Sequence, residues 1–229
     1  LVGSEMCIRD RMGDNDFAPA DISKSPVLKR RVEAVREMRL GSKKKATQRS
    51  ADTPYLFQED HQPDCAYVGI PAVVSETRRF YTAAQLGPEV IAGNKLFTAV
   101  DPDGLLFGLI SSSMFITWQK TVGGRLKSDL NFANTLTWNT FPVPELDEKA
   151  RQKIIKAGKK VLDARALHPE RSLAEHYTPL AMAPELIKAH DGLDREVDKA
   201  FGAPRKLTTI RQRQELLFAN YEKLISHQS

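Results

Sequence analysis

Hydrophobic residues recur with helical spacing in three stretches near the end of the chain, which begin near Asp147, Pro184 and Thr208. Each stretch also has a polar face with mixed charges, so each predicts an amphipathic helix. The apolar faces comprise Ile154, Ile155, Val161 and Leu162 in the first; Leu186, Ile187, His190, Leu193, Val197 and Phe201 in the second; and Ile210, Leu217, Tyr221, Leu224 and Ile225 in the third. Together they predict a small helical bundle over residues 145–229, with His190 as a core residue.

The pattern before this bundle is mixed. Ser25–Leu40 predicts a basic helix, and Ala66–Val74, rich in Tyr, Val and Ile, predicts a buried strand. Leu105–Val122 predicts one largely apolar helix that stops at two glycines, and the two prolines of Asn139–Pro144 are typical of a domain boundary. We therefore predict an α+β fold, in which a mixed domain with a small sheet over residues 12–144 precedes the C-terminal helical bundle.

The first ten residues, Leu1–Asp10, resemble the translation of a transposon-based sequencing adapter. We therefore expect Leu1–Arg11 to be an artefact and the natural sequence to extend upstream of it. The alternative is a genuine short N-terminal arm. Cys65 is then the one natural cysteine, and a single thiol forms neither a disulfide framework nor a four-ligand zinc site. This cysteine usage indicates a reducing compartment, and no apolar run approaches the roughly 18 residues that a membrane span needs.

The net charge of +5 is unevenly placed along the 229 residues. Ten Lys or Arg residues lie between Lys24 and Arg49, against two Glu, whereas residues 50–229 are balanced. This asymmetry favours a polyanionic partner. The tract has no aromatic residues, so it suits phosphate contact better than base stacking, and Lys43, Lys44 and Lys45 are the candidates. The alternative is a solvated surface helix.

Motifs of catalysis are missing from the sequence. It contains no Asn/Asp-Pro-Pro-aromatic loop, glycine-rich cofactor turn, phosphate loop, His-Glu-x-x-His or Gly-x-Ser-x-Gly. The five histidines do not have the spacing of metal ligands. We therefore expect no catalytic residue, no metal site and no cofactor in this chain.

Gly124–Leu130 is the most informative stretch for recognition. In an extended strand, Arg125, Lys127 and Asp129 would share one face, with neighbours roughly 6.6 Å apart. A lysine donor beside an aspartate acceptor matches the two acceptors of guanine and the amino donor of cytosine in the major groove. The alternative is a solvated ion pair.

Two adjacent arginines, Arg78 and Arg79, follow the predicted strand 66–74 within Ser75-Glu76-Thr77-Arg78-Arg79. Arginines placed after a strand can hold phosphates or a base edge. Ordinary surface charge is the alternative interpretation.

Three stretches are similar to the closing half of the target-recognition domain of MmeI-like restriction–modification enzymes: Ser111–Trp118, Gly124–Asp129 and Trp138–Pro144. Ile70-Pro71 and Ser75–Arg79 upstream, and Ser172–Tyr177 and Pro184–Asp194 downstream, extend the resemblance. It spans roughly residues 28–225.

Members of this family join a nuclease, an adenine-N6 methyltransferase that uses S-adenosylmethionine, a recognition domain and a C-terminal helical part in one chain. The resemblance covers only the last two. It implies double-stranded DNA as the partner, with the S-adenosylmethionine and Mg²⁺ sites in missing domains of the same chain, in a bacterial or archaeal cytoplasm. By the same resemblance, Lys127 and Asp129 read a guanine, and Asn94 and Lys95 lie near a second reading position. Independently of the resemblance, the charges of Arg125, Arg78 and Arg79 make them candidates for contact with the DNA backbone.

Two other functions remain open from the sequence. One is a nucleic-acid binder without sequence preference, built on the basic tract 24–49. The other is a subunit-docking module, in which the bundle helices pack against a partner chain.

Overall fold

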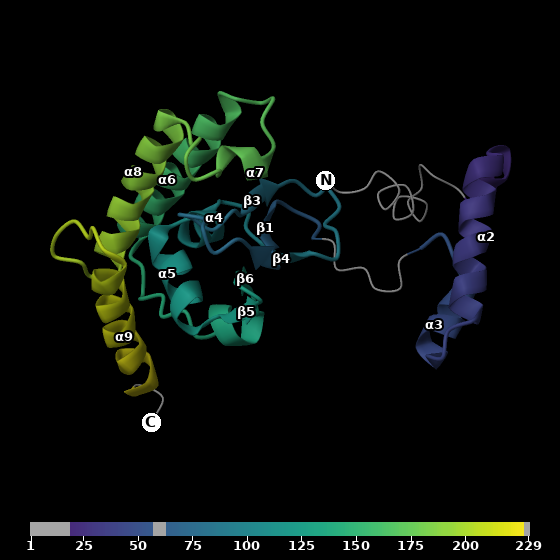
Figure 1. Cartoon of the computed structure of the whole chain (residues 1–229), viewed down its shortest axis with the longest axis horizontal. Coiled ribbons are helices and arrows are strands. Elements are labelled where there is room, and N and C mark those ends of the chain that lie inside the picture. The colour runs from purple at the N-terminus through teal and green to yellow at the C-terminus, as the bar shows by residue number, and fades with distance from the viewer. Residues whose placement is uncertain (1–18, 57–62, 227–229) are drawn as a thin grey trace. The chain divides into compact units, whose positions relative to one another are not determined.

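The computed structural model describes residues 19–56 and 63–226, which belong to two compact units (Figure 1). One unit contains residues 1–62 and 89–93, and the other contains residues 63–88 and 94–229. The expected artefact, Leu1–Arg11, lies outside the described residues.

In the first unit, the predicted basic helix is confirmed as α2 (Pro26–Leu40), where the hydroxyl of Ser25 accepts a hydrogen bond from the Leu28 N–H. The remaining described elements of this unit are η1 (Pro19–Lys24), α3 (Lys45–Arg49) and η2 (Ser50–Asp52). Arg39 is 4% exposed and donates to the carbonyl oxygens of Ser50, Thr53 and Leu56. A single arginine of the basic tract therefore links α2 to η2 and to the residues that follow η2.

The second unit contains two three-stranded antiparallel sheets, in the strand orders β3-β1-β4 and β2-β6-β5. The strands are β1 (Tyr67–Pro71), β2 (Val73–Val74), β3 (Ala84–Leu86), β4 (Leu96–Val100), β5 (Gly124–Leu126) and β6 (Asp129–Asn131).

The prediction of one strand over Ala66–Val74 is wrong, because the chain changes sheets at Ala72. The Ala72 N–H donates to the carbonyl of Lys95, which precedes β4, and the Ala72 carbonyl accepts from Phe132, which follows β6. A single residue with its two backbone groups bonded to different sheets ends β1 and starts β2.

The prediction of one helix over Leu105–Val122 is also wrong, since α4 (Leu105–Ile110) and α5 (Ser113–Val122) are separate helices. The Ser112 hydroxyl donates to the carbonyl of Leu109 and accepts from the N–H of Phe115, so it ends one helix and caps the next. Residues 134–138 form a π-helical turn, η3 (Asn134–Trp138).

The three predicted C-terminal helices are confirmed as α6 (Glu148–Ala166), α8 (Pro184–Ala200) and α9 (Ile210–Ser226), with the short α7 (Leu173–His176) between the first two. On α9, Leu217 is fully buried, but Ile210, Leu224 and Ile225 are 40–52% exposed, contrary to the prediction. On α5, Trp118 meets Phe218 and Tyr221 of α9, and Arg213 and Asn220 of α9 bond to Asp198 and Phe201. These contacts leave the exposed side chains at the two ends of α9 uncovered.

One hydrophobic core contains residues from both sides of the boundary expected at residue 144, among them Phe115, Trp118, Ile154 and Val161. Helix α4 packs against α6, and α5 packs against α8 and α9. The fold is α+β, as predicted, with the strands in the first part of this unit and the C-terminal helices α6, α8 and α9 packed on α4 and α5 (Figure 1). Within residues 19–56 and 63–226, no helix combines the length and the hydropathy that crossing a bilayer requires.

Candidate nucleic-acid interface

Strands β5 and β6 form a hairpin joined by the two-residue turn Lys127-Ser128, with Leu126 paired to Asp129. Lys127 has φ = +58°, in the left-handed region that two-residue hairpin turns use at a central position. The prediction of one extended strand over Gly124–Leu130 is therefore wrong, and Lys127 and Asp129 do not alternate along one face. The reason is burial: the turn places Leu130 in the core at 0% exposure and leaves Leu126 at 55%.

The two predicted base-reading side chains lie at one end of this hairpin. Lys127 is exposed at the turn and, among the described residues, has no carboxylate partner. Asp129 begins the return strand, is half-buried, and accepts a long hydrogen bond of 3.4 Å from the backbone N–H of Glu76. A donor and an acceptor are thus presented together at a tip that can approach a ligand.

Arg125 contacts both the turn of the hairpin and the segment after β2. Its guanidinium donates to the carbonyl of Ser128 at 2.9 Å and lies 3.4 Å from the carboxylate of Glu76. Glu76 therefore contacts both strands of the hairpin, through its backbone at Asp129 and through its side chain at Arg125. The role predicted for Arg125 at a DNA backbone stays a prediction.

Arg78 and Arg79 attach the segment after β2 to the C-terminal helices. Arg78 donates to the carbonyl of Ala174 in α7 at 2.7 Å, and Arg79 donates to Asp191 in α8 at 2.9 Å. The Arg79 guanidinium also lies 5.0 Å from the ring of Phe80, which stacks on His190 at 3.8 Å. These contacts do not test the predicted phosphate binding of the two arginines, which remain half-exposed or exposed.

The other predicted residues belong to elements other than the hairpin. Asn94 and Lys95 are exposed just before β4, in the sheet that does not contain the hairpin. Lys43, Lys44 and Lys45 are exposed at the start of α3 in the other compact unit. The structure therefore gathers Lys127, Asp129 and Arg125 at one place and leaves Asn94 and Lys95 as separate predictions.

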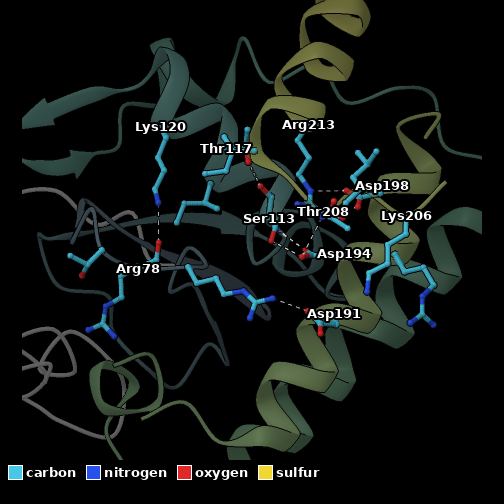
Figure 2. Close-up of a pocket in the computed structure, with 16 residues that line it drawn as sticks. Arg78, Ser113, Thr117, Lys120, Asp191, Asp194, Asp198, Lys206, Thr208 and Arg213 are labelled. Atoms are coloured by element: carbon cyan, nitrogen blue, oxygen red, sulfur yellow. Dashed lines mark hydrogen bonds and ion pairs between the residues drawn. The ribbon is translucent and has the colours of Figure 1, made fainter. Parts of the chain in front are cut away.

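A cavity of about 430 Å³ lies beside this segment, lined by Thr77–Arg79, α5, α8 and residues 206–213 (Figure 2). Sequence reasoning missed four basic residues there, namely Lys120, Arg195, Lys206 and Arg213. Lys120 was missed because it lies within an apolar helix. Burial lowers the pKa of its ammonium group, and the nearby Arg125 lowers it further. A lysine directly after the run Met114–Gln119, within a largely apolar helix, was the available signal.

Buried carboxylates on α8 line the same cavity. Asp194 accepts from the backbone N–H and the hydroxyl of Ser113, and Asp198 accepts two hydrogen bonds from Arg213. Burial raises the pKa of both carboxyl groups, and these partners oppose that change. In the described part of the chain, no group of three or more His, Cys, Asp or Glu side chains could hold a metal ion.

Comparison with known proteins identifies the module. The family described as the MmeI target recognition domain matches residues 13–145, and the MmeI C-terminal domain matches residues 146–228. The chain belongs to the MmeI family. The resemblance found in the sequence is thereby confirmed.

This chain is also similar to two named proteins. DNA methyltransferase A of Bacillus subtilis (strain 168) is 32% identical over 210 residues, which are 92% of this chain and 24% of that protein. The solved structure of the Type IIL restriction-modification enzyme MmeI in complex with DNA matches with a TM-score of 0.83 and 36% identity, over 95% of this chain and 28% of that one. The chain thus spans about a quarter of the length of these MmeI relatives.

Proposed function

We propose that this chain recognises a specific site in double-stranded DNA for a methyltransferase of the restriction–modification class. Its family and its two relatives, a DNA methyltransferase and a DNA-bound restriction-modification enzyme, support this function. The observation that carries the proposal is the hairpin tip, where exposed Lys127 lies beside Asp129.

A two-stranded ribbon fits the major groove of B-form DNA, which is about 12 Å wide. At the tip, the ammonium of Lys127 donates to the O6 and N7 acceptors of guanine, and the carboxylate of Asp129 accepts from the N4 amino group of cytosine. One G·C pair in one orientation satisfies both side chains. In the reverse orientation, donor would face donor and acceptor would face acceptor.

The test is to exchange the two charges, Lys127→Glu with Asp129→Arg, in the intact protein. We expect the preferred base at one position to change from guanine to cytosine, as measured by sequencing the methylated sites. Lys127→Arg is the matched control and should retain guanine, since arginine also donates to O6 and N7. An unchanged target site in the double variant would refute the assignment, and binding that is strong but equal for all duplexes would favour the non-specific function.

For the whole protein, we propose adenine-N6 methylation with S-adenosylmethionine, an endonuclease that uses Mg²⁺, and a cytoplasmic location. The chemistry belongs to domains outside this chain, and the recognition module holds a target adenine where such a domain can extrude it. Mass spectrometry of nucleosides from treated DNA should find N6-methyladenine. Finding methylated cytosine instead would contradict the adenine assignment.

A docking function has one observation in its favour. Leu224 and Ile225 of α9 are 40% and 48% exposed and follow its ring contacts with α5, so this end of α9 offers an exposed apolar surface. If this surface packs against another part of the protein, Ile225→Glu should lower the thermal stability of the intact protein and leave its target site unchanged. A change of target site with unchanged stability would exclude this role.

A further inference from the structure

The cavity beside the hairpin has more basic than acidic side chains. Six Lys or Arg residues and three Asp residues line it. The three carboxylates already have donors: Asp191 binds Arg79, Asp194 binds Ser113, and Asp198 binds Arg213. Two of the six cations are therefore used within the protein.

Three of the other cations have no acidic partner within the described part of the chain. No carboxylate of residues 19–56 and 63–226 lies within ion-pair distance of Lys120, Arg195 or Lys206. The Lys120 ammonium donates to a single acceptor among these residues, the carbonyl of Arg78 at 3.2 Å, although it carries three hydrogens. Because Lys120 is half-buried, water replaces the missing acceptors less readily than it does at an exposed lysine.

These cations are spread around the cavity. Figure 2 shows Lys120 and Lys206 on opposite sides, with the Asp194 and Asp198 side chains near Ser113 and Arg213 between them. A ligand with more than one anionic group suits this distribution better than a single ion.

We propose that this cavity binds phosphate groups of a nucleic-acid strand through Lys120, Arg195 and Lys206. The strand is the backbone of the DNA that the hairpin reads, and to that extent the inference rests on the proposed function. The location agrees with this source, since Thr77 and Arg78 of the cavity directly follow Glu76, which contacts Asp129 and Arg125 of the hairpin. Helix α5, helix α8 and the loop before α9 thereby bind the DNA backbone next to the base pair that the hairpin reads.

The experiment measures the salt dependence of duplex DNA binding by the intact protein with Arg195→Ala, Lys206→Ala and Lys120→Met. The first two residues are exposed, so their replacement leaves the core intact, and methionine retains the apolar stem of Lys120. For each phosphate that is no longer bound, the slope of log K against log salt should become shallower by about 0.9, and the affinity should fall for all duplex sequences alike. Lys159→Ala, which removes an exposed charge from α6 outside the cavity, is the matched control and should leave the slope unchanged.

A second arm titrates the protein with inorganic phosphate and follows the amide resonances of Thr77 and Lys120. Shifts produced by phosphate, with no change of slope in the variants, would show that the cavity takes a free phosphate compound and would overturn the DNA source. Unchanged slopes without phosphate-induced shifts would overturn the site itself. If the slopes change but the Lys127/Asp129 exchange leaves the target site unchanged, the phosphate site stands and the base-reading function fails.

Discussion

The guanidinium of Arg79 donates to the carboxylate of Asp191 at 2.9 Å and so joins the segment after β2 to α8, 112 residues later in the chain. The same segment contains Glu76, whose backbone and side chain contact the hairpin. The C-terminal helices are therefore connected to the predicted base-reading tip through four consecutive residues, Glu76–Arg79.

Replacing Asp191 with Asn should reduce the discrimination between the preferred site and a site with one mismatched base pair. The side chains of Arg79 and Asp191 are 51% and 41% exposed, so their ion pair contributes at most about 1 kcal/mol to holding the segment in place. We expect the ratio of the two affinities to fall by up to about fivefold. Competition binding with matched and mismatched duplexes measures it.

Glu215→Gln is the control for Asp191→Asn, because it breaks an exposed ion pair with Arg211 within α9. It should leave the ratio unchanged. If Asp191→Asn weakened binding to all duplexes equally, Arg79 would act on the backbone and not by positioning the hairpin.

The crossing of α4 and α6 depends on glycine at two positions. A Cβ atom added at Gly108 would lie 2.8 Å from the Ile154 side chain, and one at Gly158 would lie 3.3 Å from the Cα of Gly108. Gly108→Ala should therefore lower the free energy of unfolding by about 1–3 kcal/mol through overpacking.

Gly192→Ala in α8 is the matched substitution, because no atom lies within 4 Å of the added Cβ. It should raise the free energy of unfolding by up to about 1 kcal/mol through helix propensity alone. Urea unfolding of both variants provides the test, and a loss of stability at Gly192 equal to that at Gly108 would contradict the steric explanation.

His190 should make stability depend on pH. It is fully buried, its Nε2 lies 2.7 Å from the Tyr177 hydroxyl, and burial lowers its pKa well below the usual value, with further lowering by Arg165 and Arg79. Below about pH 6.5 the unfolded chain binds a proton that the folded chain does not. The free energy of unfolding should therefore fall on acidification, by at most about 1.4 kcal/mol per pH unit for this group.

Urea unfolding at about pH 7.5 and about pH 5.5 measures this dependence in the wild type and in His190→Gln. In the variant, the free energy of unfolding should differ less between the two pH values than in the wild type. Part of the difference should persist, because burial also lowers the pKa of His176. His168→Gln, outside the core, serves as the control. An identical pH dependence in His190→Gln and the wild type would contradict the prediction.

Neutralising Lys43, Lys44 and Lys45 together should weaken binding to every duplex and flatten its salt dependence. All three side chains are exposed, and phosphate contacts carry no sequence information. Fluorescence anisotropy at several salt concentrations measures the slope, which should become shallower by up to about 0.9 for each phosphate that these lysines no longer neutralise. A loss of affinity for one sequence alone would show that these lysines do not contact phosphates.

Local pattern determined much of this structure. The periodicity of apolar residues in α6 and α8 predicted their buried faces, because an amphipathic helix hides the same face wherever it packs. His190 was correctly predicted as a core residue for the same reason. The order of the motifs also led to the family, and Lys127 and Asp129 were selected from the sequence by their groove chemistry.

Only the tertiary structure decided where the chain turns and which distant residues meet. Ala72 ends one strand and starts another because its two backbone groups bond to partners far along the chain, in different sheets. The Lys127-Ser128 turn replaces an extended strand because Leu130 is buried in the core and Leu126 is not. The position of Lys120 in an apolar helix led to no prediction of a site, whereas the tertiary structure places it in a cavity lined by α8 and the loop before α9. The spacing of side chains along a helix or strand can be read from the sequence, whereas pairing between residues 53 to 112 positions apart depends on the packing of the whole unit.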